Sequence, residues 1–334
     1  MLGVYNQLPI SFERGEGAWL FDSAGNKYLD AYAGIAVTVL GHNHPVVTKV
    51  IQDQAAKIVH ESNVVLIPQQ IELSNILSEL SGMESKVFFN NSGAEAVETA
   101  IKLARLYGHS KNINNPKIIV MEGAFHGRTL TTIFAGGSAK AQDGFGPPVP
   151  GFVRVKYNDP AAVEAAIKSD PDIVAVLIEP IQGESGVNTP SADYLVEVRA
   201  ICDRHNTLML LDEVQTGMAR TGKFFCHQFN KILPDAICMA KGLANGLPIG
   251  ACIIRAPHCD LFKIGSHGST FGGNPLSCAA AIATVQEIQK HKWHENAAKQ
   301  GQKIIDGLTK ALNTIYNEVR GTDHNLSNGN LLNI

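Results

Sequence analysis

The chain has 334 residues, of which 45% are hydrophobic and 18% are charged, and its formal net charge is −3. This composition is that of a globular protein and excludes a disordered or collagen-like chain, while the length allows a large core and more than one domain. The slightly negative charge, without any basic block, argues against a nucleic-acid or anionic-membrane partner and favours small-molecule chemistry.

The N-terminal stretch has no basic segment followed by an apolar one, and no later run is long and apolar enough to span a membrane. We therefore expect a cytoplasmic protein. Residues 4–45 are rich in turn signals, and short strands at 18–21 and 27–30 fit a small antiparallel unit. Apolar residues then recur at helical spacing over 45–59 and again over 69–80.

A strand over residues 86–89 leads into the first strongly marked helix. Ser92 and Glu95 form an S-x-x-E pattern, which predicts a capping box at the helix start. The simplest interpretation is a good helix cap. The alternative is that small residues there leave the free amide groups open to a phosphate.

Three further strands are predicted over 117–121, 152–157 and 173–178, with a helix over 161–169. The first is followed by a loop with Phe125, His126 and Arg128, and the third by a loop with two glutamates, one of them Glu184. Each loop alone is weak evidence. The recurrence of polar groups at strand ends favours one ligand site, because ligands of open α/β sheets bind at the carboxyl ends of the strands.

The stretch 207–242 carries the most specific pattern. Two apolar runs, read as buried parallel strands, are followed by single charges, Asp212 and Lys241. A lysine that leaves a core strand is desolvated, which lowers its pKa and makes it a candidate Schiff-base amine. A carboxylate beside it can keep a pyridine nitrogen protonated. The pair therefore indicates pyridoxal phosphate chemistry.

The same stretch contains a competing pattern. Gly217, Gly222 and Lys223 match the opening of a phosphate-binding P-loop, but Phe224 stands where a serine or threonine should bind magnesium. We regard nucleotide binding as a minor alternative.

The remaining elements complete an alternating pattern. A strand over 249–254, a glycine-rich loop over 265–275 and helices over 275–290 and 295–312 predict a mostly parallel sheet, while residues 322–334 look unstructured. The six cysteines lie far apart without a C-x-x-C pair, so we expect neither a metal site nor a disulfide framework.

Six motifs together resemble the class III, ornithine-type aminotransferases, and in particular the acetylornithine aminotransferases. They are FFNNSGAEAVETAIKLAR, AFHGRT, EPIQGESGV, LDEVQTGMARTG, KGLANGLPIGA and HGSTFGGNPL, in the family's order. The resemblance implies the α/β fold type I of aspartate aminotransferase, with a mainly parallel seven-stranded sheet flanked by helices and a smaller α+β domain. It also implies pyridoxal 5'-phosphate as cofactor and a homodimer that shares its active sites. Residues 1–45 would start the small domain, 46–290 would form the large domain, and 291–334 would be an incomplete remnant of the small domain.

The resemblance also implies a role for each residue at a matching position. Lys241 would bond to the cofactor and shuttle protons, and Asp212 would pair with the pyridinium. The other residues divide into cofactor contacts and substrate contacts. The cofactor contacts would be Gln215 at the phenolate oxygen, Phe125 stacked on the ring, and Gly93, Ala94 and the partner subunit's Thr270 at the phosphate. The substrate contacts would be Arg128, Ser269 and Glu184.

The family pattern ends near Gly321, where family members continue with several tens of residues that include a further arginine. We therefore expect a truncated or altered C-terminus, with a tail unlike the family from about residue 322. The leading hypothesis is transfer of the terminal amino group of N-acetylornithine to 2-oxoglutarate, within arginine biosynthesis. Succinylornithine, N-succinyldiaminopimelate, ornithine and 4-aminobutyrate remain alternative donors, and a catalytically silent, cofactor-binding chain is an alternative of another class.

Overall fold

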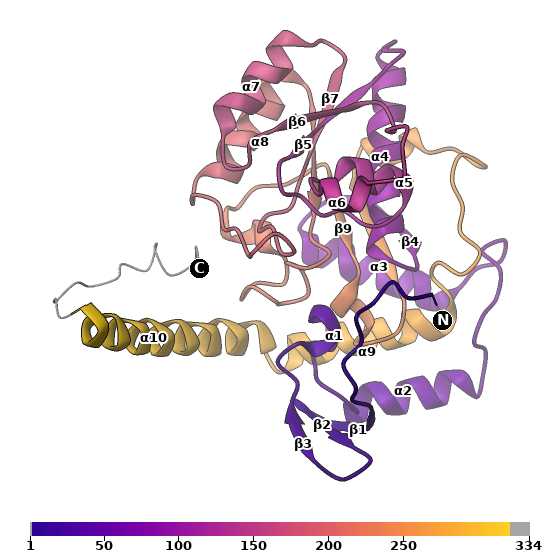
Figure 1. Cartoon of the computed structure of the whole chain (residues 1–334). Coiled ribbons are helices and arrows are strands. Elements are labelled where there is room, and N and C mark those ends of the chain that lie inside the picture. The colour runs from indigo at the N-terminus through magenta and orange to yellow at the C-terminus, as the bar shows by residue number, and fades with distance from the viewer. Residues whose placement is uncertain (1, 321–334) are drawn as a thin grey trace.

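A computed structural model describes residues 2–320. The N-terminal unit is a three-stranded antiparallel sheet of β1 (Phe12–Glu16), β2 (Trp19–Asp22) and β3 (Lys27–Leu29), as the turn-rich sequence predicted. It lies apart from the main sheet, below α9 in Figure 1. A short helix, α1 (Ala33–Ala36), joins it to the rest of the chain.

The main sheet has seven strands in the order β4-β10-β9-β8-β7-β5-β6. Only β10 runs against its two neighbours, and the other pairings are parallel, which confirms the mainly parallel sheet. The strands are β4 (Ser85–Asn90), β5 (Lys117–Met121), β6 (Phe152–Val155), β7 (Ile173–Ile178), β8 (Leu208–Asp212), β9 (Ala236–Met239) and β10 (Gly250–Arg255).

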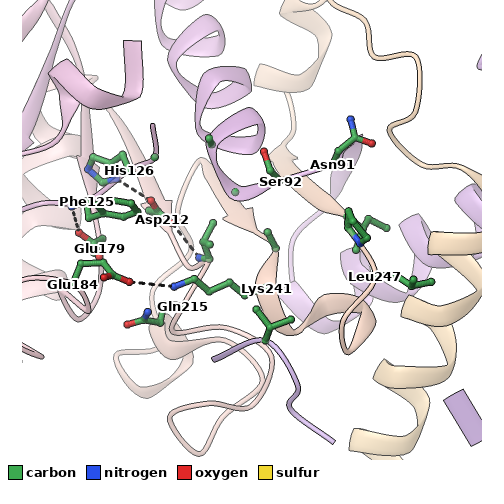
Figure 2. Close-up of a pocket in the computed structure, with 18 of the residues that line it drawn as sticks. Asn91, Ser92, Phe125, His126, Glu179, Glu184, Asp212, Gln215, Lys241 and Leu247 are labelled. Carbon is green, nitrogen blue, oxygen red and sulfur yellow. Dashed lines mark hydrogen bonds and ion pairs between the residues drawn. The ribbon is translucent and has the colours of Figure 1, made fainter. Parts of the chain in front are cut away.

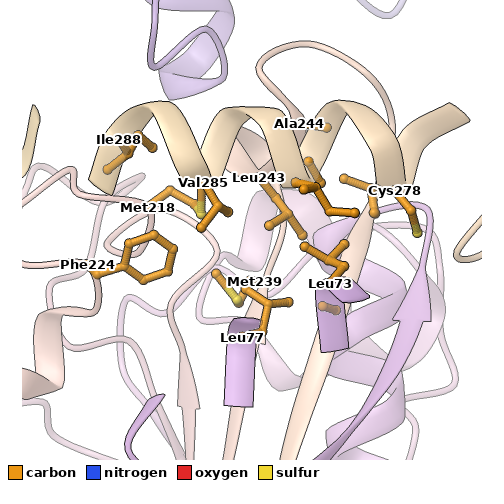
Figure 3. Packing of buried hydrophobic residues seen from close by; sticks show 14 of the residues in the cluster. Leu73, Leu77, Met218, Phe224, Met239, Leu243, Ala244, Cys278, Val285 and Ile288 are labelled. Atoms are coloured by element: carbon orange, nitrogen blue, oxygen red, sulfur yellow. The ribbon is translucent and has the colours of Figure 1, made fainter. Parts of the chain in front are cut away.

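Helices cover both faces of this sheet, which explains why the central strands are continuously apolar. On one face, α4 (Gly93–Ser110) packs over β5, β7, β8, β9 and β10. On the other, α7 (Pro160–Ser169) and α8 (Tyr194–His205) cover β5, β7 and β8, while α2 (Pro45–Ala55), α3 (Pro68–Ser81) and α9 (Pro275–Lys290) cover β9 and β10. Figure 3 shows the packing under α9, where Leu73, Leu77 and Met239 meet Leu243 and Val285. These helices cover the faces of the sheet and leave the edge formed by the carboxyl ends of the strands open to a ligand.

The structure corrects several element boundaries. The helix predicted over 45–59 ends at Ala55, and the one predicted over 69–80 begins at Pro68 and ends at Ser81. The two short helices α5 (Leu130–Ala135) and α6 (Ala139–Gln142) were not predicted, nor were the 3-10 turns η1 (Cys226–Phe229), η2 (Lys241–Ala244) and η3 (His258–Leu261). Segments of four to six residues carry too few positions to show a helical period.

The last described helix, α10 (Trp293–Arg320), extends the helix predicted over 295–312 at both ends. Figure 1 shows it projecting from the body of the molecule after α9. Part of its apolar stripe is uncovered by the described residues, because Ile304 and Leu308 are 61% and 57% exposed. The predicted tail, from about residue 322, lies outside the described residues.

Across residues 2–320, we find no helix that has both the length and the apolar character needed to span a membrane.

Candidate active site

A cavity of about 370 Å³ opens at the carboxyl ends of β7, β8 and β9. Because these strands are parallel, the residues at their ends, Glu179, Asp212 and Lys241, reach the same edge of the sheet. Figure 2 shows their side chains around one space, with Phe125 and His126 from the loop after β5. The clustering expected from the strand ends is therefore confirmed.

Asp212 is the last residue of β8, and its buried carboxylate pairs with the imidazole of His126. His126 Nδ1 lies 2.8 Å from Asp212 Oδ2, so the Nδ1 hydrogen is donated to the carboxylate. The other carboxylate oxygen accepts from the backbone N–H of Val214 at 3.1 Å. Asp212 is thus held in one orientation while it lines the cavity.

Lys241 follows the end of β9 after one intervening residue and begins η2 with a left-handed backbone, φ 40°. Burial lowers the pKa of its ammonium group, and the nearby carboxylates of Glu184, Asp212 and Glu179 oppose that shift. Its Nζ lies 3.7 Å from Glu184 Oε1. An amine whose pKa is lowered holds its proton less tightly, which suits a nucleophile.

Glu179 is buried immediately after β7 and joins two loops of the site. One oxygen accepts from the Phe125 N–H at 2.8 Å and the other from the Gly183 N–H at 3.3 Å. Burial raises its pKa to about 7, and the charge of Asp212 adds to this effect. Glu179 therefore fixes the backbone of the aromatic Phe125 and can change its charge near neutral pH.

The start of α4 forms another wall of the cavity. Ser92 caps the helix by accepting from the Glu95 N–H at 3.2 Å. The predicted capping box is only half right, because Glu95 accepts from the N–H and side-chain amide of Asn91 instead of the Ser92 N–H. Gly93 has no room for a side chain, since a Cβ there would lie 2.7 Å from Val214.

Most of the residues assigned from the motifs meet in this cavity. Gly93, Ala94, Phe125, Glu184, Asp212, Gln215 and Lys241 all line it. Arg128 is exposed and stands next to it, with its guanidinium carbon 5.3 Å from the centre of the Phe125 ring.

Two assigned residues lie elsewhere. Ser269 and Thr270 line a separate hollow of about 460 Å³, together with His60 and Asn63. Ser269 is still linked to the main cavity, because its Oγ lies 3.3 Å from Asn91 Nδ2, and Asn91 lines that cavity.

The residues of the cavity fit pyridoxal phosphate. The start of α4 offers free backbone N–H groups at Gly93 and Ala94, where an anion is stabilised. Phe125 and Val214 are apolar side chains suited to a flat ring, and Asp212 supplies a carboxylate for a ring nitrogen. Lys241 supplies the amine for the aldehyde. By contrast, residues 217–223 form turns and lack the strand-to-helix transition of a P-loop, so the nucleotide alternative is not supported.

His126 and Glu179, the first of the two glutamates after β7, were not among the residues assigned to the site from the sequence. Both are buried at its base, and His126 is fully enclosed. A single histidine or glutamate in a loop is more often solvated than functional, so their types carried little signal. The usable signal was their position at or soon after a strand end: Glu179 follows β7 directly, and His126 lies in the loop after β5.

The comparisons with known proteins agree with this site. A family model described as aminotransferase class-III matches residues 3–330. The acetylornithine aminotransferase of Nitrosomonas europaea is 51% identical over 312 residues, which cover 93% of this chain and 79% of the relative. Acetylornithine aminotransferase 1 of Bordetella pertussis is 47% identical with the same coverage.

Solved structures show the same fold. An ornithine aminotransferase from Toxoplasma gondii, described with partial occupancy of PLP at its active site, has a TM-score of 0.90 and 35% identity, covering 92% of this chain and 73% of its own. The acetylornithine aminotransferase of Elizabethkingia anophelis has a TM-score of 0.82 and 37% identity, with 93% and 76% covered. The fold and site are those of an aminotransferase with a fold type I sheet. The chain belongs to the class-III aminotransferases.

Proposed function

We propose that this chain is a pyridoxal-phosphate-dependent transaminase that passes the terminal amino group of N-acetylornithine to 2-oxoglutarate, a step of arginine biosynthesis. The observation that carries the proposal is the placement of Lys241 in one cavity with the buried Asp212–His126 pair. The names of the similar acetylornithine aminotransferases support the choice of donor. We further propose that the enzyme works in the cytoplasm.

When bound, pyridoxal phosphate supplies an electron sink that stabilises negative charge on the substrate carbon. Asp212, held by His126, would pair with the ring nitrogen and keep it protonated. With the cofactor bound, Lys241 Nζ would accept a proton from the substrate carbon and hold it for the return transfer, for which its lowered pKa is suited. Phe125 would orient the ring, and the start of α4 would hold the phosphate.

Substrate carboxylates need a cationic group near this cavity. Arg128 offers a planar guanidinium beside Phe125, and a bidentate pair with a carboxylate is stronger and more directional than a pair with lysine. Glu184, which lines the cavity at the Lys241 amine, is placed to contact the amino end of the donor. The donor is then held between a carboxylate contact and an amine contact.

We also propose a homodimer in which Thr270 reaches the phosphate in the partner subunit. Thr270 is exposed outside its own subunit's cavity, at the hollow shared with His60 and Asn63. Val64 lines that hollow and Phe271 lies beside its His60, and these apolar side chains are 89% and 61% exposed. Exposed apolar residues grouped in this way are typical of a protein interface.

The test combines cofactor mapping with donor profiling. The purified protein, saturated with pyridoxal phosphate, is reduced with borohydride and digested, and the modified peptide is identified. We expect the label on Lys241, loss of label in Lys241→Ala, and unchanged labelling in Lys223→Ala, which alters another lysine of the same stretch. Label on a different lysine would contradict the assignment.

Initial rates with N-acetylornithine, succinylornithine, N-succinyldiaminopimelate, ornithine and 4-aminobutyrate then rank the donors. We expect the largest kcat/KM for N-acetylornithine. A larger kcat/KM for another donor would identify that donor as the substrate in place of N-acetylornithine. Label on Lys241 without turnover of any donor would identify a silent, cofactor-binding chain.

A further inference from the structure

The glycine-rich loop between η3 and α9 is attached to α4 through the side chain of His267. The imidazole lies in a small cavity of about 140 Å³, between Phe88 of β4 and Phe262. The Phe88 and His267 ring centres are 4.5 Å apart. His267 precedes Ser269 and Thr270 by two and three residues, so its position helps to set theirs.

Both ring nitrogens of His267 have a partner on α4. Nδ1 lies 2.9 Å from Lys102 Nζ, and Nε2 lies 3.0 Å from Thr99 Oγ1. An ammonium group can only donate, so Nδ1 must accept and carry no hydrogen. Nε2 therefore carries the hydrogen and donates it to Thr99, and the imidazole is neutral in this arrangement.

The other hydrogen bonds of the loop are made by groups that do not titrate near neutral pH. Lys102 Nζ also donates to the Ser266 carbonyl at 2.8 Å. Asn63 Nδ2 donates to the carbonyls of Ser269 and Gly272 at 2.9 and 3.1 Å. Among the described residues, two imidazoles take part in the contacts of the loop: His267 through both ring nitrogens, and His60, whose ring centre lies 5.2 Å from that of Phe271.

The charges that face His267 come from α4 and from the walls of the cavity. Burial lowers the pKa of His267, the Lys102 ammonium lowers it further, and Glu95 acts in the opposite direction. Lys86 and Cys259 also line the cavity, but the Lys86 ammonium pairs with Asp260 at 2.7 Å. A proton on His267 would remove the acceptor at Nδ1 and set two cations in contact.

We propose that His267 is a positioning residue whose neutral imidazole fastens the loop carrying Ser269 and Thr270 to α4, and whose protonation releases that loop. This inference rests on the proposed function for the role of Thr270 at the cofactor phosphate. The docked loop favours neutral His267, whereas a released loop exposes an ordinary imidazole. Docking is therefore strongest above about pH 6.5 and weakens as the pH falls through the lowered pKa of the docked state.

The first experiment uses the cofactor-free full chain, so that it does not depend on the proposed function. Hydrogen exchange of peptides covering residues 264–274 is measured from pH 5 to 8 and corrected for the intrinsic chemical rate. We expect protection to fall on acidification. In Lys102→Met, which keeps the aliphatic stem but removes the charge, the midpoint should move to higher pH by about one unit, because a like charge in contact shifts a pKa by that order.

Two further variants complete the test. Lys86→Met alters another lysine of the same cavity and should leave the midpoint unchanged. His267→Gln keeps an N–H donor for Thr99 and should give protection that no longer varies over this pH range. The proposal would be overturned if exchange protection in the natural chain did not vary with pH. It would also be overturned if Lys102→Met had the same midpoint as the natural chain. Both outcomes can be read even if His267→Gln fails to fold.

The second measurement is pyridoxal phosphate affinity, followed by absorbance of the bound cofactor. We expect Lys102→Met to lose affinity at a higher pH than the natural chain does, in parallel with the exchange midpoint. If no variant binds the cofactor while the exchange midpoints behave as expected, the proposed function fails and the positioning role stands. A further outcome is that the exchange midpoints shift while the pH dependence of cofactor affinity is the same in Lys102→Met and the natural chain. In that case His267 positions the loop only, and its link to cofactor binding is overturned.

Discussion

His126 and Asp212 form a hydrogen-bonded pair of 2.8 Å at the base of the cavity, and both side chains are buried. The imidazole Nε2 is also buried and has no hydrogen-bond partner among the described residues. The Nδ1–H donated to Asp212 fixes the orientation of a carboxylate that lines the cavity, where a ring nitrogen could meet it. The pair therefore joins the loop after β5 to the end of β8, at the position where the proposed function needs a carboxylate for the ring nitrogen.

The first prediction concerns Asp212→Asn. The amide can still accept from His126, so cofactor binding at Lys241 should persist, but a neutral group cannot hold a proton on the pyridine nitrogen. Turnover should fall by several orders of magnitude, measured as single-turnover rates with the amino donor. Asp53→Asn, an exposed change that disturbs only a pair with Lys49, is the control. Turnover near that of the natural chain would show that another group protonates the ring.

Much of this site could be predicted from the sequence, because the end of a buried strand is marked there by an apolar run that stops at a charged residue. Asp212 and Lys241 each close an apolar run, and parallel pairing then brings them together. The contacts of Glu95 could not be predicted, because whether it caps Ser92 or Asn91 depends on one backbone turn. The separation of Ser269 from the main cavity was equally hidden, since it depends on how a glycine-rich loop packs against α4, whereas the resemblance already implied that Thr270 serves the partner subunit.

The second prediction concerns Glu179→Gln and pH. Burial raises the pKa of Glu179 to about 7 from an ordinary value of 4.5. A raised pKa in the folded state gives stability that is present below about pH 4.5 and is lost as the pH rises through about 7. The natural cofactor-free protein should therefore lose Tm between pH 5 and 8 in part through this group, and Glu179→Gln should show a flatter profile over that range.

The control for Glu179→Gln is Glu122→Gln, an exposed change in the neighbouring loop. Its Tm should follow the natural profile. Parallel profiles for all three proteins would mean that Glu179 holds no proton near neutral pH, and its contacts with the Phe125 and Gly183 N–H groups would then be purely structural.

The third prediction concerns Arg128→Lys. A lysine cannot bind a carboxylate with two parallel hydrogen bonds, so KM for the amino donor should rise while cofactor affinity changes little. The loss should be about 1.5–3 kcal/mol, the range for hydrogen bonds to charged groups, which corresponds to a factor of about 10–150. Arg204→Lys, an exposed arginine near Glu164, serves as the control. Equal KM values in the natural and Arg128→Lys proteins would remove Arg128 from the substrate site.

The last prediction concerns α10 and limited proteolysis. Ile304 and Leu308 are largely exposed on this projecting helix, whereas Ile288 of α9 is 1% exposed in the core. Burying such a side chain contributes roughly 1.5–3 kcal/mol, so α10 gains little from packing and should open more readily than the sheet. A protease should cut first beyond residue 290 and leave a resistant core of about residues 46–290. Ile304→Ser should shift Tm only slightly and Ile288→Ser strongly, since surface substitutions usually stay within about 0.5 kcal/mol. Uniform resistance of the chain, with an equal Tm loss in both variants, would show that the exposed stripe of α10 is covered in solution.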